Sequence, residues 1–269
     1  LEDKEQLFNI ATVAGRGQQE LARLVVEGAQ MLGEKRLLQD DYRLAEAVIA
    51  REAAENQVFN GVVLNRQAVN REMPRELQEP LILVVDDALA PEDMNHEAMK
   101  TESGFQYYLQ ARETYEKNLR KVVDLGVKLV VADRSIDDLA EEIFTEAGIM
   151  ALHRVSSREI ERLCQHTGAK KVKRVTLNRS PEAIVPFLGK ARRVVTDEKL
   201  EHTCIYGGSG ENWTTIIVGA ATGEVVDERE RIARDAASAV QAAVRNGTVP
   251  GGGALEIWLA TEMEKLARS

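Results

Sequence analysis

The chain has 269 residues, of which 44% are hydrophobic and 29% charged, an ordinary balance for folded domains. The formal net charge of −9 argues against a nucleic-acid partner, because phosphate binding needs clustered Lys and Arg. No apolar run reaches the roughly 20 residues of a membrane-spanning helix and no secretory signal pattern opens the chain, so we expect no membrane partner and a cytoplasmic location. The two cysteines, Cys164 and Cys204, and the four histidines lack metal-ligand spacing, so we expect no metal site and two reduced thiols.

The first 64 residues change from helical to strand-like patterns. Apolar residues recur at helical spacing on both sides of Gly15-Arg16-Gly17, which predicts two helices over 3–35 with a short break between them. Residues 43–64 have the character of strands.

Residues 81–126 combine a strand with a long helix. The continuous apolar run "LILVVDD" (81–87) predicts a buried strand of a parallel sheet. The next residues, 88–101, have no clear period. A long polar helix follows, with Ser103 as its expected cap and Gly126 as its end.

Residues 127–168 alternate strand and helix patterns with short links, which is typical of a layered α/β fold. We expect strands in "VKLVVAD" and "IMALHRV". The first helix has a capping-box-like start at Ser135 and ends at Gly148, and the second ends at Gly168.

Beyond residue 172 the sequence turns to strands and tight turns. Strands are expected in "KRVTLNR", "RRVVTDE", "HTCIYGG" and "NWTTIIVGAA", and the glycine-rich stretch 207–213 is expected to be a hairpin turn instead of a phosphate loop. The last long helix is expected to start near Asp227, with Glu230 at capping-box spacing, and to run to Asn246.

Two features near the end of the chain stand out. Gly251–Gly253 separate two helical patterns, either as a tight inter-helix turn or as backbone that approaches an anion closely. Asp235 lies on an alanine-rich helix, either as a solvated acid favoured by the helix dipole or as a functional group. No P-loop, nucleophile elbow or H-E-x-x-H motif occurs.

These residues together resemble a known family. The segment "ERERIARDAASAVQAAVRNGTVPGGGALE" is similar to the chaperonin segment that leads from the intermediate domain to the nucleotide-binding equatorial domain. The stretch "LFNIATVAGRGQQELARLVVEGA" resembles the nucleotide-sensing stretch of the same family. "NGVVLNRQAVNREMPRELQEPLILVVDDAL" and the residues from "GVKLVVADRS" to "CQHTGA" resemble the apical domain of thermosome-like (group II/III, TCP-1-type) chaperonins.

The resemblance implies a domain plan. The fold is expected to be α/β: a layered apical domain (58–205), with a sheet, flanking helices and a helical lid protrusion, is inserted in a mainly helical α+β intermediate domain (1–57 and 206–254). Residues 255–269 would begin an equatorial helix. The family's phosphate loop is absent, so the resemblance implies an intermediate-plus-apical part of a longer subunit.

The resemblance also implies the chemistry. Asp235 would be the catalytic aspartate that orients or deprotonates the water attacking ATP. Arg16 stands where thermosomes typically carry Lys, which keeps the positive charge but presents a planar fork. ATP and Mg²⁺ would serve the full-length subunit, and the chain alone is expected to bind neither. The residues implied in nucleotide contact are Gly15, Arg16, Gly17, Gly251, Gly252 and Gly253.

The implied function is ATP-dependent protein folding in a homo-oligomeric double ring, with unfolded client proteins as partners. A built-in lid, with its tip around 90–106, would replace a separate co-chaperonin cap. Phe105, Tyr107, Tyr108 and Leu109 lie close together at the start of the long helix. Either they pack the helix onto the apical core, or the lid tip meets neighbouring subunits when the lid closes and offers apolar contacts to clients when it is open. The alternatives are an ATP-independent module that binds unfolded proteins and an α/β phosphate-ester enzyme.

Overall fold

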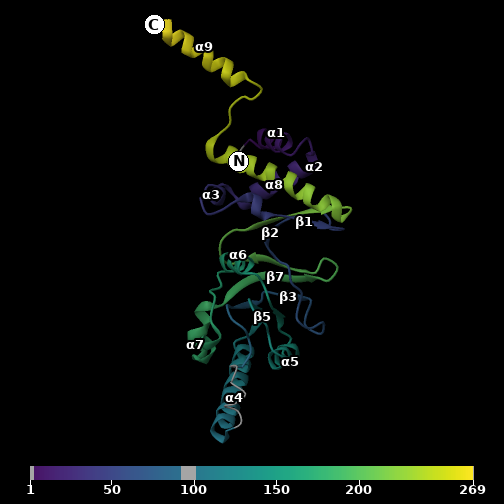
Figure 1. Ribbon diagram of the computed structural model, residues 1–269, viewed down its shortest axis with the longest axis vertical. Coiled ribbons are helices and arrows are strands. Elements are labelled where there is room, and N and C mark those ends of the chain that lie inside the picture. Colours follow the sequence, from purple (N-terminus) through teal and green to yellow (C-terminus); the bar gives the residue numbers. More distant parts are fainter. Residues whose placement is uncertain (1–2, 92–100, 269) are drawn as a thin grey trace. The chain divides into compact units, whose positions relative to one another are not determined.

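The chain folds into two units, and the computed structural model describes residues 3–91 and 101–268 (Figure 1). The first unit consists of Leu1–Val58 and Ile216–Ser269, and the second, Phe59–Thr215, is inserted between them. The inserted unit ends at Thr215, ten residues beyond the end expected at residue 205. The reason is that the strand of residues 202–208 pairs with two strands of the inserted unit. The apical and intermediate roles of the two units stay a prediction.

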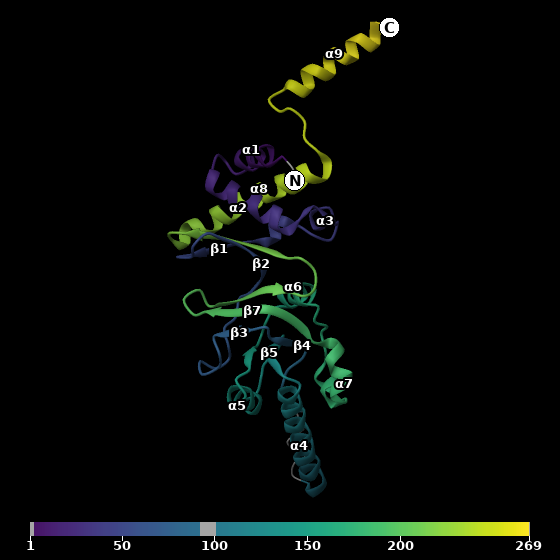
Figure 2. The ribbon, with the colours of Figure 1, turned by 180° about the vertical axis from the view of Figure 1, so that it is seen from behind.

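In the first unit, three helices pack side by side and a pair of parallel strands lies with them (Figure 2). Strands β1 and β9 pair from Val48 with Ile216 to Glu52 with Ala220. The two helices expected over 3–35 are confirmed. The elements of this unit are α1 (Lys4–Ala14), α2 (Gln19–Leu32), α3 (Glu34–Leu37), η1 (Leu44–Ala47), β1 (Val48–Glu52), β9 (Thr214–Ala220), α8 (Gly223–Asn246) and α9 (Ala254–Arg268).

Helix α8 packs through a face of small residues. Ala233, Ala236 and Ala237 are fully buried, which lets α1 and α2 approach α8 closely. The helix ends at Asn246 before Gly247, which has φ 75°, as expected. The expected start near Asp227 is wrong, because α8 begins at Gly223 after Thr222.

A buried glutamine on α8 ties down the segment between α3 and β1. The Gln241 side chain accepts a hydrogen bond from the Leu44 amide at 2.8 Å and donates to the carbonyls of Leu37 and Tyr42 at 2.9 and 3.0 Å. Arg245 donates to the same two carbonyls. The Leu44 amide is a donor, which Arg245 cannot satisfy because a guanidinium only donates, so this amide depends on the Gln241 side-chain oxygen as its acceptor.

We therefore expect Gln241→Leu to lower the free energy of unfolding by about 1–3 kcal/mol, the cost of leaving a buried amide without an acceptor. Hydrogen exchange measured by NMR should show that the Leu44 amide loses protection. Arg234→Gln, on the exposed side of the same helix, is the control and should leave that amide protected. Unchanged exchange at Leu44 in Gln241→Leu would contradict the assigned role.

The inserted unit is built on a mixed sheet with strand order β2-β8-β7-β4-β5-β6, and β3 pairs with β7. Strands β4, β5 and β6 are parallel, and β7 and β8 run antiparallel to their partners. The strands are β2 (Gln57–Leu64), β3 (Glu76–Gln78), β4 (Leu81–Val85), β5 (Val127–Ala132), β6 (Met150–Leu152), β7 (Gly189–Asp197) and β8 (His202–Gly208). The helices are α4 (Glu102–Asp124), α5 (Asp138–Glu146), α6 (Ser157–Thr167), η3 (Arg174–Asn178), α7 (Pro181–Ile184) and η4 (Val185–Phe187).

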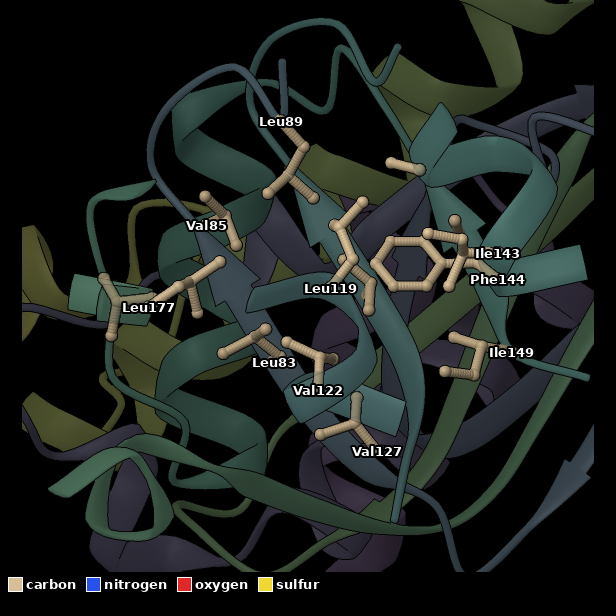
Figure 3. Packing of buried hydrophobic residues seen from close by; sticks show 14 of the residues in the cluster. Leu83, Val85, Leu89, Leu119, Val122, Val127, Ile143, Phe144, Ile149 and Leu177 are labelled. Atoms are coloured by element: carbon tan, nitrogen blue, oxygen red, sulfur yellow. The ribbon is translucent and has the colours of Figure 1, made fainter. Parts of the chain in front are cut away.

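The core of this unit lies between the parallel strands and the helices α4 and α5 (Figure 3). Phe144 is fully buried and lies among aliphatic side chains of neighbouring elements. Leu83 and Leu119 join it from β4 and α4. The apolar run that predicted a buried strand at 81–87 is confirmed, since residues 82–85 are fully buried.

Two helices begin at caps other than those expected. The hydroxyl of Thr101, and not that of Ser103, accepts a hydrogen bond from the Gly104 amide at the start of α4. Asp137, and not Ser135, caps α5 by accepting from the Ala140 amide at 3.0 Å. Asp137 also accepts from the Tyr115 hydroxyl at 2.7 Å, so one carboxylate joins α5 to α4.

Two expectations for the segment after residue 168 are wrong. The stretch "KRVTLNR" forms the 3-10 helix η3 instead of a strand. The glycine-rich stretch 207–213 is no hairpin turn, since the chain beyond it joins β2: the Gly61 amide donates to the Trp213 carbonyl at 2.8 Å. The loop instead caps α6, because the amides of Gly210 and Glu211 donate to the last carbonyls of that helix.

His166 fastens this loop through both ring nitrogens. Nε2 accepts from the Gly208 amide at 2.9 Å, and Nδ1 lies 3.2 Å from the Glu211 carbonyl, so the ring that satisfies both contacts is neutral. Burial lowers the pKa of His166 below its ordinary value.

Because the folded protein favours neutral His166, the unfolded chain binds a proton more readily. The stability from this residue is fully present above the unfolded pKa of about 6.5 and is lost as the pH falls below it. The free energy of unfolding, measured with urea from pH 7.5 to 5, should fall with the pH. His166→Gln keeps one donor and one acceptor but does not titrate, so the free energy of its unfolding should depend less on pH. An identical dependence of the free energy of unfolding on pH in His166→Gln and the wild type would contradict the prediction.

Candidate functional site

The loop between α1 and α2 is a tight reversal of the chain. The amides of Gly15 and Gly17 donate to the Ala11 and Thr12 carbonyls at 2.7 and 2.8 Å. Arg16 and Gly17 have φ of 54° and 79°, in the left-handed region that glycine adopts without strain and arginine does not. The loop therefore holds Arg16 at its apex at some cost in backbone strain.

Gly15 lets this loop lie against α8. A Cβ atom on Gly15 would come within 2.7 Å of the Ala11 carbonyl oxygen and 3.6 Å of the Ala236 Cβ atom. A side chain at this position would clash with the last turn of α1, whereas 3.6 Å to Ala236 is an ordinary van der Waals contact with α8. The loop thus meets α8 one residue beyond Asp235.

Asp235 shares one face of α8 with two other charged residues, Glu228 and Arg231, at helical spacing. Arg231 Nη2 lies 2.8 Å from both carboxylate oxygens of Glu228, and its Nη1 lies 3.4 Å from Asp235 Oδ2. Arg16 Nη1 reaches across from the loop to Glu228 Oε1 at 2.9 Å. The four side chains form one row of contacts: Arg16, Glu228, Arg231, Asp235.

All four side chains of this row are between 46% and 56% exposed, so water and ions reach them. The Arg231 guanidinium that donates to Glu228 holds the pKa of that carboxyl below its usual range, and the charges of Arg231 and Arg16 act in the same direction. The same contact raises the pKa of Arg231. The contact between Glu228 and Arg231 thus favours the charged form of both residues.

The structure brings together Arg16 and Asp235, which the sequence placed more than 200 residues apart, and two residues that the sequence reasoning missed join them. The spacing of Glu228, Arg231 and Asp235 could have indicated ion pairs along one helix face. Nothing in the sequence indicated that Glu228 also accepts a hydrogen bond from Arg16.

Gly251–Gly253 form a turn before α9, and Gly252 and Gly253 have φ of 68° and 83°. In the described part of the chain, no residue other than its two chain neighbours lies within 4 Å of the Cβ position of each of these glycines. The backbone is therefore open to a ligand, but no contact joins it to the row of charges. Its nucleotide role stays a prediction.

A second candidate surface lies on the first half of α4. Phe105, Tyr107 and Leu109 are 43% to 54% exposed, and close packing of α4 begins only at Tyr115. The hypothesis that these residues pack the helix onto the core is therefore wrong for Phe105, Tyr107 and Leu109, whereas Tyr108 is half-buried. Residues 92–100 of the expected lid tip lie outside the described residues.

Within the ranges 3–91 and 101–268, no group of three or more His, Cys, Asp or Glu side chains can hold a metal ion. No helix in those ranges is long and apolar enough to cross a membrane.

An α/β unit inserted into a helical unit whose interhelical loop contacts a row of alternating charges on α8 is a chaperonin-like arrangement, and the comparisons agree. The sequence profile of the TCP-1/cpn60 chaperonin family matches residues 1–269. The chain belongs to the TCP-1/cpn60 chaperonin family.

Several thermosome subunits are similar to this chain. It is 31% identical to thermosome subunit alpha of Archaeoglobus fulgidus over 288 residues, which covers 99% of this chain and 51% of that subunit. It is 30% identical to a thermosome subunit of Desulfurococcus sp. (strain SY), covering 96% of this chain and 49% of the relative. The chain thus spans about half the length of these relatives.

Solved chaperonin structures have the same fold. A group III chaperonin in the open state superimposes with a TM-score of 0.90 at 40% identity, covering 99% of this chain and 54% of that one. An open-state monomer of a group II chaperonin from Methanococcoides burtonii gives a TM-score of 0.72 at 22% identity, which supports the fold alone. The predicted fold class and family are confirmed.

Proposed function

We propose that this chain is the client-binding and ATP-coupling part of an ATP-dependent protein-folding chaperonin subunit. The observation that carries the proposal is the row of ion pairs that links Arg16 to Asp235. A cation that meets phosphate and a carboxylate that orients water are the two groups that coupling of ATP hydrolysis to a protein movement requires.

In this proposal each group has a separate task. The Arg16 guanidinium donates to phosphate oxygens with two parallel N–H groups. The Asp235 carboxylate accepts a hydrogen bond from the attacking water and orients it toward the γ-phosphate. Gly251–Gly253 offer backbone without Cβ atoms to the nucleotide.

ATP and Mg²⁺ are held mainly by residues outside this chain. The described residues offer no cluster of metal ligands, and the sequence has no phosphate loop. The chain also covers only about half of its thermosome relatives. The bound metal would neutralise phosphate charge, and this chain would add Arg16 and Asp235.

The inserted unit is assigned the apical role. Its exposed side chains on α4, with Phe105 and Leu109 on one face of the helix and Tyr107 on another, offer apolar area to unfolded clients or to neighbouring subunits. The assembly is a double ring of identical subunits in which the apical unit provides its own lid, so no separate cap protein is needed.

A refolding assay with the assembled chaperonin distinguishes ATP-driven folding from holding without ATP. We expect a denatured client to be captured without nucleotide and to regain activity only after ATP is added. Release of active client at equal rates with and without ATP would support the holding module and contradict the proposal. Phosphate release from a phosphate monoester such as p-nitrophenyl phosphate by the purified 269-residue chain alone would favour a phosphate-ester enzyme.

A further inference from the structure

We propose that Glu228 and Arg231 are positioning residues that couple phosphate binding at Arg16 to release of the Asp235 carboxylate. The proposal rests on the function proposed above, in which Arg16 senses phosphate and Asp235 orients water. It adds two residues and the direction of the coupling: Arg16 acts on the Asp235 carboxylate through the Arg231 guanidinium.

Glu228 is the shared anion of the row. Its Oε1 accepts from Arg16 Nη1 at 2.9 Å, and both of its oxygens accept from Arg231 Nη2 at 2.8 Å. Arg231 Nε adds a contact to Oε2 at 3.2 Å. One carboxylate therefore divides its charge between two guanidinium groups.

Arg231 is shared unequally between two carboxylates. Its contacts to Glu228 are three, at 2.8 to 3.2 Å, whereas it meets Asp235 once, at 3.4 Å. The contact with Asp235 is the weaker one, and it breaks first when Glu228 attracts Arg231 more strongly.

Phosphate binding supplies that change. A phosphate group carries more negative charge than a carboxylate and also accepts two parallel N–H bonds, so it draws Arg16 away from Glu228. Glu228 then has Arg231 as its remaining partner in the row. Arg231 moves fully onto Glu228, and Asp235 is left without its guanidinium and free to accept from water. No covalent bond changes in this exchange.

The surroundings of the row allow the exchange at low cost. All four side chains are about half exposed, and exposed ion pairs contribute little net energy, so partners can be replaced. Apart from its chain neighbours Arg16 and Gln18, no described residue lies within 4 Å of the Cβ position of Gly17, so the far side of this glycine is open to an anion that approaches Arg16.

Two neutral variants of the assembled chaperonin give opposite expected results. In Glu228→Gln, Arg16 is released and Arg231 pairs with Asp235 alone. The ATP concentration at half-saturation therefore falls, and single-turnover hydrolysis slows. In Arg231→Gln, Glu228 holds Arg16 alone and Asp235 is unpaired, so half-saturation rises and hydrolysis of bound ATP speeds up. Each shift is expected to be about two- to fivefold, the range of an exposed ion pair.

Three further variants make the test specific. Arg231→Lys keeps the charge and should lie closer to the wild type than Arg231→Gln. Arg234→Gln breaks an ion pair on the same helix, between the half-exposed Arg234 and the more buried Glu230, one residue from Asp235, and should change neither quantity. Asp235→Asn should slow hydrolysis strongly.

The coupling would be overturned if Glu228→Gln and Arg231→Gln shifted half-saturation by ATP and the single-turnover rate in the same direction. It would also be overturned if these shifts were no larger than those in Arg234→Gln. If Asp235→Asn is slow under that outcome, the proposed function stands and the coupling alone fails. If Asp235→Asn hydrolyses ATP at the wild-type rate, the proposed function fails and the coupling fails with it.

Discussion

Asp235→Ala is expected to slow single-turnover ATP hydrolysis by the assembled chaperonin about a hundredfold or more, the usual effect of removing a group that positions or deprotonates the nucleophile. ATP binding should change little, because Asp235 is proposed to orient water and not the nucleotide. The residue is half exposed and outside the core, so the fold should persist.

Rapid-quench hydrolysis and a separate measurement of ATP affinity test this prediction. Arg234→Ala is the matched control on the same helix and should behave as the wild type in both measurements. Loss of ATP binding in Asp235→Ala with unchanged hydrolysis of the ATP that is bound would show that the assigned role is wrong.

Phe144→Ala is expected to lower the free energy of unfolding of the inserted unit by about 3–5 kcal/mol, the range for removing a buried aromatic ring. The ring lies inside the cluster formed by the parallel strands with α4 and α5, where surrounding side chains cannot close the space fully (Figure 3).

Urea unfolding of the 269-residue chain measures this loss, with Val175→Ala as the control. Val175 is 58% exposed, so its truncation should cost less than about 0.5 kcal/mol. A loss below about 1 kcal/mol for Phe144→Ala would mean that the cluster repacks or contributes little.

The strands of the inserted unit were predictable where burial on both faces makes the sequence continuously apolar. The runs at 81–87 and 127–133 became β4 and β5. In the stretch 173–179, apolar and polar residues alternate as they do in a half-buried strand, yet the stretch forms η3. There Leu177 enters the core, while the Lys121 ammonium donates to the Leu177 and Arg179 carbonyls. Such tertiary contacts have no local signal.

Helix ends were predictable to within a few residues. Thr101 and Ser103 are both good cap residues, so local preference could not choose between them. Asp137 prevailed over Ser135 because its carboxylate caps α5 and also binds the Tyr115 hydroxyl, a contact between segments 22 residues apart.

The site was predictable only in part. The family resemblance pointed to Arg16 and Asp235, and the fold places both in one row of charges. Glu228 and Arg231 were missed because solvated charges are common on a helix face. Their role depends on a loop that reaches α8 from the other end of the chain.

The most direct test of the account is a structure of the assembled chaperonin with ADP and aluminium fluoride, an analogue of the transferring phosphate. We predict the Asp235 carboxylate within hydrogen-bond reach of the attacking water, about 2.6–3.2 Å, with Arg16 on the fluoride and Arg231 on Glu228 alone. An Asp235 carboxylate still paired with Arg231 and far from the analogue would contradict the account.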